Sequence, residues 1–159
     1  MKKPDWKIWI KDNKECKFWL DIYIKKGVLR RSINESRLYL RKTEHNLNFA
    51  NWIFEKNNKK FEIFNEENYY DWITNIYYYA IYHSALALLS KKRYQSKSHS
   101  ATLCFLIYFY CHKNKELDFD DVELVASSLS QEELSKEDIE IIGASKELRE
   151  KACYDVSFL

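Results

Sequence analysis

Residues 76–110 read IYYYAIYHSALALLSKKRYQSKSHSATLCFLIYFY, and this stretch decides the fold of the chain. Two strongly apolar segments flank a short basic loop. In the first segment, Tyr69 to Ser90, apolar side chains recur every three or four positions, as at Ile73, Ile76 and Ala80. Further apolar residues leave little of the circumference polar. The pattern predicts a helix that lies in the middle of a bundle or at an interface.

The second segment, His99 to Lys113, is apolar almost without a break from Ala101 to Cys111. A helix needs about 20 apolar residues to cross a bilayer, and this run is much shorter. It therefore predicts a second buried helix, in a protein without a membrane partner.

The loop between the two helices combines a predicted helix start with a cluster of positive charge. Ser98 is a good candidate for the N-cap of the second helix, which places His99 in its first turn. Backbone N–H groups at a helix N-terminus favour phosphate binding. The surrounding cations are Lys91, Lys92, Arg93 and Lys97.

The two helices and their loop resemble a known family. Residues 78–89, YYAIYHSALALL, and the following Lys97-Ser98-His99-Ser100 are similar to the HEPN family (higher eukaryotes and prokaryotes nucleotide-binding). Small prokaryotic members have a Tyr-Tyr-Ala helix that ends in Ala-Leu-Leu, and then a Lys-Thr-His helix start. Near the C-terminus, residues 148–149 (Leu-Arg) and 152–154 (Ala-Cys-Tyr) resemble the closing helix, which more often reads Ala-Asp-Tyr. The resemblance covers residues 34–156.

The resemblance implies a site and an activity. HEPN ribonucleases carry an Arg, four to six residues and a His, and Arg93 and His99 have this spacing. In the family the His moves a proton and the Arg holds the phosphate, without a metal ion or other cofactor, usually across a homodimer interface. Both residue types suit these roles. The expected function is RNA binding with endoribonuclease activity, in a toxin–antitoxin or defence system of the cytoplasm.

Two departures keep a non-catalytic alternative open. Active members often have a polar residue after the Arg, where this chain has Tyr94, and some have a Tyr where this chain has Ala101. An Arg and a His at this spacing in a basic loop also arise by chance. The alternative is a HEPN module that binds a nucleotide or a partner minimal nucleotidyltransferase, and a third possibility is a dimeric scaffold with no ligand.

His83 and Tyr79 are further candidates, on the central helix. His83 either supports Arg93 or His99 from below the loop or is a hydrogen-bonded core histidine, which is the more common situation. Tyr79 belongs to a group of tyrosines that either stack on bases or form the core and a dimer interface. His45 and His112 have no ligand partners at metal spacing and are predicted to lie on the surface. No metal site is predicted.

Length and composition predict the fold class. The chain has 159 residues, of which 46% are hydrophobic, with only 2 Gly and 1 Pro. Many-stranded β proteins need more turn residues than this. We therefore expect a single all-α domain over residues 1–159, an up-and-down antiparallel bundle of four main helices with one or two additions. The four cysteines lack CxxC spacing, which favours buried thiols in a reducing compartment.

Charge is distributed unevenly along the chain. Residues 1–113 carry 21 Lys and Arg against 11 Asp and Glu, a net charge of +10, whereas residues 114–159 have a net charge of −8. The positive part contains the candidate site and could attract a polyanion. Solvated faces are the common alternative for both parts.

The remaining helices are predicted from spacing and caps. Residues 1–31 form an N-terminal extension that the resemblance does not cover, with a helix over Lys14–Lys26 that has Cys16, Leu20 and Ile24 on one side and Gly27 as its C-cap. A further helix over Asn34–Phe54 has Ile33, Leu40, Leu47, Ala50 and Phe54 on one stripe. A short helix over Asp118–Leu129 is followed by helix starts at Ser130 and Ser135. The last helix ends near Val156.

Overall fold

The chain is mostly helical, as the sequence predicted. The computed structural model describes residues 3–58 and 70–139. The chain divides into two compact units, Met1–Ser128 and Leu129–Leu159, and the single domain predicted over residues 1–159 stays a prediction. The elements are α1 (Trp6–Trp9), α2 (Asn13–Lys25), β1 (Leu29–Arg31), α3 (Ser36–Asn58), α4 (Tyr70–Lys91), β2 (Tyr94–Ser96), α5 (His99–Leu106), the π-helix η2 (Ile107–Lys113) and α6 (Phe119–Ile139).

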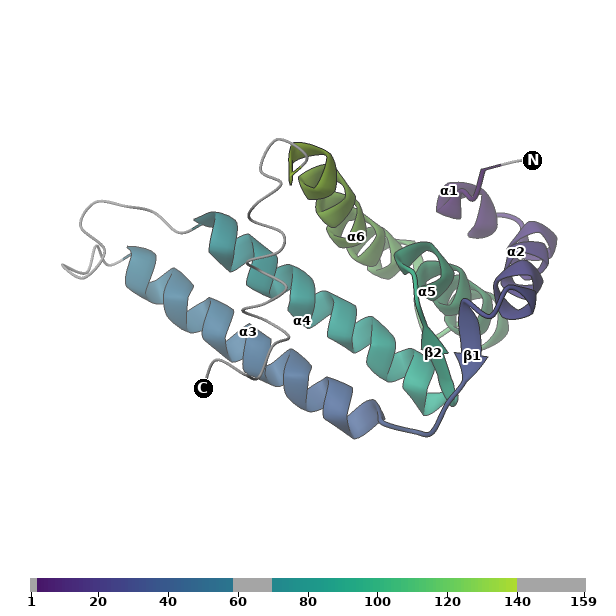
Figure 1. The fold of residues 1–159 in the computed structure, drawn as a ribbon, viewed down its shortest axis with the longest axis horizontal. Coiled ribbons are helices and arrows are strands. Elements are labelled where there is room, and N and C mark those ends of the chain that lie inside the picture. The colour runs from purple at the N-terminus through teal and green to yellow at the C-terminus, as the bar shows by residue number, and fades with distance from the viewer. Residues whose placement is uncertain (1–2, 59–69, 140–159) are drawn as a thin grey trace. The chain divides into compact units, whose positions relative to one another are not determined.

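Helices α3 and α4 run antiparallel along each other (Figure 1). The side of α3 that faces α4 carries small and polar residues rather than large aliphatic ones. Thr43 donates to the carbonyl of Ala80, and Ala50 is fully buried. This helical pair is part of the predicted bundle. The bundle of four main helices also requires residues 140–156, which lie outside the described residues, so that arrangement stays a prediction.

The core of the first unit is formed around α5 and η2. Every residue from Ala101 to Tyr108 is buried, and the segment contacts α2 as well as α4. The Tyr110 hydroxyl donates to the carbonyl of Leu88 at 2.7 Å, which satisfies a polar atom within this apolar region. The sequence predicted one buried helix over His99–Lys113. The prediction is confirmed for burial, but the helix widens to π geometry from Ile107.

A two-stranded antiparallel ribbon joins the N-terminal region to the connection between α4 and α5. Strand β1 pairs with β2 in the register Leu29 to Ser96, Arg30 to Gln95 and Arg31 to Tyr94. The sequence had predicted an irregular loop at residues 91–98. A three-residue strand is too short for alternation to reveal it, and its partner is far away in the sequence.

Helix α2 begins after Asp12, whose side chain accepts from the backbone N–H groups of Lys14 and Glu15. It ends before Gly27, whose φ of 65° is the left-handed conformation that a glycine adopts without strain. Of the three residues predicted on one side of this helix, Cys16 and Leu20 are buried. Ile24 is exposed, because the last turn of α2 leaves the core where the chain turns into β1.

The apolar stripe predicted for residues 33–54 was largely wrong. Ala50 is buried, whereas the four larger members are exposed: Ile33, Leu40, Leu47 and Phe54. The α4-facing side of α3 lies beside this stripe, and it is formed by smaller or polar residues that include Thr43 and Asn46. This side also carries Tyr39, whose ring stacks on that of His83, so polar and aromatic side chains rather than the aliphatic stripe contact α4.

Helix α6 continues from Phe119 to Ile139 without interruption. Neither Ser130 nor Ser135 therefore begins a helix, although both have the capping-box pattern. Such patterns permit a cap but cannot impose one when the preceding turn already continues as a helix. The last helix, predicted to end near Val156, lies outside the described residues.

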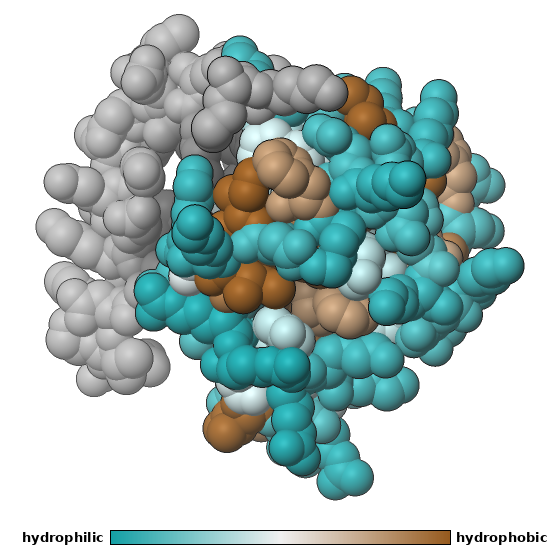
Figure 2. All heavy atoms as spheres, turned by 90° about the vertical axis from the view of Figure 1, so that its right-hand side faces the viewer, coloured by the Kyte–Doolittle hydropathy of each residue, from teal (hydrophilic) through white to brown (hydrophobic). Residues whose placement is uncertain are grey.

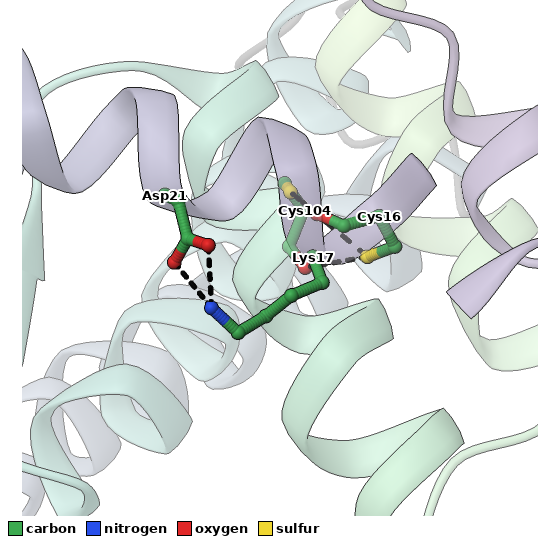
Figure 3. A network of polar contacts seen from close by, with 4 residues as sticks. All are labelled: Cys16, Lys17, Asp21 and Cys104. Atoms are coloured by element: carbon green, nitrogen blue, oxygen red, sulfur yellow. Dashed lines mark hydrogen bonds and ion pairs between the residues drawn. The ribbon is translucent and has the colours of Figure 1, made fainter. Parts of the chain in front are cut away.

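Two buried thiols join α2 to α5. The Sγ atoms of Cys16 and Cys104 lie 4.0 Å apart, and each thiol also donates to the backbone carbonyl of the other residue (Figure 3). The hydrogen bond from Cys16 and burial raise the pKa of Cys104. Burial also raises the pKa of Cys111 to about 11, although Cys111 is only half-buried. On the outer side of α2, Lys17 forms an ion pair with Asp21.

The side of the molecule that carries α1 and α2 is mainly hydrophilic, with smaller hydrophobic patches (Figure 2). The large hydrophobic side chains exposed on these two helices are Ile8, Phe18 and Ile24. Among the helices of the described residues, none has both the length and the apolar character needed to cross a membrane.

Candidate functional site

Arg93 occupies the turn between α4 and β2. Its φ of 60° is a left-handed conformation, which is uncommon for a residue with a side chain. The turn is closed by a hydrogen bond from the Arg93 N–H to the carbonyl of Ser90 at 2.9 Å. This conformation reverses the chain at the end of α4, and it leaves the Arg93 side chain exposed to solvent.

His99 lies in the first turn of α5, as predicted. Ser98 is the N-cap, and its side chain accepts from the N–H of Ala101 at 3.2 Å. The half-buried imidazole has its Nε2 atom 3.2 Å from the Tyr78 hydroxyl, and the Tyr82 ring meets it edge-on at 4.8 Å between centroids. These two tyrosines fix the orientation of the His99 ring. Histidine is a side chain that can act as an acid or a base.

Strand β2 separates Arg93 from His99 within one chain. The strand is extended from Tyr94 to Ser96, and extended backbone rises about 3.3 Å per residue. The Cα atoms of Arg93 and Lys97 are therefore about 13 Å apart, and His99 follows beyond Lys97. The structure thus brings His99 to Tyr78 and Tyr82, while it places Arg93 at the opposite end of the strand.

The three predicted lysines differ in their surroundings. Lys91 and Lys97 are exposed, at the end of α4 and just after β2. Lys92 is half-buried, and its Nζ atom lies 5.6 Å from the centroid of the Tyr110 ring. Lys92 therefore packs on the core, whereas Lys91 and Lys97 are available to an anionic ligand.

His83 is on the α3 side of α4. Its Nδ1 atom lies 3.2 Å from Nδ2 of Asn46, and its ring stacks on those of Tyr39 and Tyr79. Burial lowers the pKa of His83, as does the positive charge of Lys42. These contacts agree with a hydrogen-bonded core histidine, which was one of the two interpretations of this residue.

The other two histidines have different environments. His45 is exposed on α3, as predicted. His112 is half-buried, and its Nε2 atom donates to the carbonyl of Trp9 at 2.8 Å. The predicted surface location of His112 was therefore wrong. Its partner is more than 100 positions away in the sequence, so no local pattern could indicate it.

Sequence reasoning missed two cations of β1, Arg30 and Arg31, which the ribbon places beside β2. Both are exposed. The guanidinium carbon of Arg31 lies 4.3 Å from the centroid of the Tyr94 ring, and Nε of Arg30 donates to the carbonyl of Gly27 at 2.6 Å. The only sequence signal was the basic pair itself, which gave no indication of its partner strand.

Several exposed cations surround the ribbon. Within residues 3–58 and 70–139, no carboxylate forms an ion pair with Arg30, Arg31, Lys91, Arg93 or Lys97. Their charge is therefore directed to solvent and to any anion that approaches. Solvent-exposed charges of one sign raise the local concentration of an oppositely charged ligand.

Comparisons of this chain with models of protein families, with curated proteins and with solved structures found no match. In the part of the chain that the structure describes, no three His, Cys, Asp or Glu side chains are grouped as a metal ion would require.

Proposed function

We propose that this chain is an RNA-binding protein of the HEPN type and a metal-independent endoribonuclease, with His99 and Arg93 in its site. One observation carries the proposal. A half-buried histidine, held by the Tyr78 hydroxyl at a helix N-terminus, follows a strand with exposed cations around it, and no carboxylate among the described residues pairs with these cations. A polyanion with a reactive hydroxyl beside each phosphate, which is RNA, suits this combination.

The proposed reaction needs one acid and one base. The 2′-oxygen of a ribose forms a bond to the adjacent phosphorus, and the bond from phosphorus to the 5′-oxygen breaks. A neutral His99 accepts the proton of the 2′-hydroxyl, while a protonated His99 of a second chain donates a proton to the 5′-oxygen. Arg93 binds the phosphate oxygens, whose negative charge rises during the reaction. The products are a 2′,3′-cyclic phosphate and a 5′-hydroxyl.

A homodimer is part of this proposal. The extended strand β2 keeps Arg93 away from His99 of the same chain. In HEPN ribonucleases the site usually forms across a dimer interface, where the arginine of one chain can approach the histidine of the other. By the same resemblance, the protein would act in the cytoplasm as a toxin or defence component.

The separation of Arg93 from His99 also favours a second candidate. If the two residues do not meet in a dimer, His99 and the exposed lysines still form a basic surface at a helix N-terminus. The chain would then be a non-catalytic HEPN module that binds a nucleotide or a partner minimal nucleotidyltransferase.

The test is RNA cleavage by the purified protein in EDTA. We expect cleavage with 2′,3′-cyclic phosphate ends, and a loss of about 100-fold or more in both His99→Ala and Arg93→Ala. His45→Ala is the matched control, because it removes an exposed histidine of α3. Circular dichroism checks that each variant is folded.

Two outcomes would contradict the nuclease. Wild-type protein that binds RNA without cutting it would leave the binding module as the function. Variants at Arg93 and His99 that cut as fast as His45→Ala would place any catalytic site elsewhere.

A further inference from the structure

The exposure of side chains alternates regularly along the segment that contains β2. Arg93, Gln95 and Lys97 are exposed, whereas Tyr94, Ser96 and Ser98 are half-buried. Along the extended chain this alternation places Gln95 and Lys97 on one side, and Arg93 adjoins them from the left-handed turn that precedes the strand. We call this side, together with the exposed Arg30 of β1, the outer face of the ribbon.

Backbone hydrogen bonds fix both ends of this face. The N–H of Ser32 donates to the carbonyl of Arg93, and the N–H of Lys97 donates to the carbonyl of Val28, each at 3.0 Å. Between these ends, Arg30 is paired with Gln95. Arg30 therefore lies across from the middle of a row that has Arg93 at one end and Lys97 at the other.

The opposite side of the ribbon attaches it to the core. Leu29 is buried, and the Tyr94 ring contacts the ring of Phe105 at 5.0 Å between centroids. The guanidinium carbon of Arg31 also lies over the Tyr94 ring. Because of these contacts the ribbon is held on α5, and an anion that binds its outer face does not have to order a flexible loop.

The composition of the outer face indicates its ligand. Three cations lie along about 13 Å of extended chain, and none of them has an acidic partner among the described residues. An extended polyanion can contact all three, whereas a single small anion cannot. The face has no apolar side chain that could enter a membrane, and the Gln95 amide can donate to and accept from a base or a ribose hydroxyl.

We propose that the outer face of the ribbon binds the sugar–phosphate backbone of single-stranded RNA. Arg30 and Lys97 contact phosphates, and Gln95 contacts a base or ribose. The N-terminal region thus supplies a binding residue, Arg30, that lies outside the Arg93–His99 motif. The inference rests on the proposed function in that RNA is the ligand, but it does not require cleavage.

The test is binding of a labelled 2′-O-methyl oligonucleotide of about 12 nucleotides, measured by fluorescence anisotropy with the full-length protein. This probe has a methoxy group in place of each 2′-hydroxyl, so the proposed cleavage reaction cannot occur. We expect Arg30→Gln and Lys97→Gln each to weaken binding about fivefold near 0.1 M salt. Each should also lower the slope of log affinity against log salt by about 0.7. Gln95→Ala should weaken binding with no change in this slope.

Controls separate the ribbon from general positive charge. Lys14→Gln removes an exposed lysine of α2 that is not on the ribbon, and it should bind within a factor of about 1.5 of wild type. Arg30 also donates a hydrogen bond to the Gly27 carbonyl, so Arg30→Gln could weaken binding by disturbing the fold. The Lys97 side chain has no hydrogen bond or ion pair among the described residues, so a loss of binding in Lys97→Gln cannot be explained in this way.

Three results would overturn the proposal. The ribbon variants could bind the oligonucleotide as tightly as wild type, or Lys14→Gln could lose as much affinity as the ribbon variants. The protein could also bind anionic vesicles but not the oligonucleotide. A DNA probe that binds as tightly as the 2′-O-methyl probe would overturn the assignment to RNA. If the ribbon variants weaken binding but the wild-type protein does not cut RNA, the endoribonuclease proposal is contradicted and the RNA-binding proposal stands.

Discussion

The segment α5–η2 and the helix α3 are both rich in apolar residues, yet they bury them very differently. From Ala101 to Tyr108 every side chain of α5–η2 is buried. Helix α3 leaves large residues such as Leu38, Phe49 and Trp52 exposed, and it faces α4 with Thr43, Asn46 and Ala50. An unbroken apolar run thus indicates burial on all sides. A periodic pattern identifies a helix, but it does not tell which side of that helix packs.

The largest expected effect tests this comparison with one substitution in two places. Leu106 is 1% exposed and Leu38 is 53% exposed. Leu106→Ala should lower the free energy of unfolding by about 2–5 kcal/mol, because it leaves a cavity in the core. Leu38→Ala should change it by no more than about 0.5 kcal/mol. Urea denaturation followed by circular dichroism measures both, and equal losses would mean that α3 is as tightly packed as α5.

A second prediction concerns the start of α5. Ser98→Ala removes the acceptor for the Ala101 N–H and should cost about 1 kcal/mol. Ser127→Ala, at an exposed position within α6, should cost nothing or stabilise slightly, because alanine favours helices. If the two variants are equally stable in urea, the cap does not stabilise α5.

The third prediction concerns pH and the interface of α3 with α4. The pKa of His83 is lowered in the folded chain, so its neutral form is favoured there. The contribution of neutral His83 to the free energy of unfolding is fully present above the unfolded pKa of about 6.5. It is lost as pH falls through the lower folded pKa. Wild type should therefore lose more stability than His83→Gln between about pH 7 and pH 5. Urea midpoints at both pH values measure this, and parallel curves would contradict it.

The smallest expected effect lies on the surface of α2. Asp21→Asn breaks the i,i+4 ion pair with Lys17 and should cost about 0.3–0.5 kcal/mol at low salt. The difference should vanish at about 1 M salt, where such pairs are screened. A cost above that of Ser98→Ala would show that this exposed pair has a role beyond local helix stability.

The sequence was sufficient for the fold class and for the local features of the site. The N-cap Ser98, the position of His99 in the first turn and the end of α2 at Gly27 all depend on residues close in sequence, and all were predicted correctly. Failures occurred where the answer depends on distant partners. The pairing of β1 with β2, the bond between His112 and Trp9 and the packed side of α3 each require tertiary contacts that spacing does not encode.

The candidate site also has features that the local sequence predicts and features that depend on distant contacts. Motif spacing identified Arg93 and His99, but it could not reveal that an extended strand separates them. Arg30 was missed because its relation to Gln95 exists only through strand pairing. The roles of these residues in RNA binding and cleavage stay predictions that the experiments above address.

The pairing of Arg31 with Tyr94 also has a consequence for the order of folding. About 60 residues separate the two strands, so direct pairing would close a long loop before other contacts compensate for the lost chain entropy. Because local contacts form faster than distant ones, we expect α3 and α4 to associate first and to bring the strand positions together. The outer face of the ribbon is therefore completed late. A partly folded chain would carry only one strand of this face, so we expect the RNA binding proposed above to develop only when the first unit has finished folding.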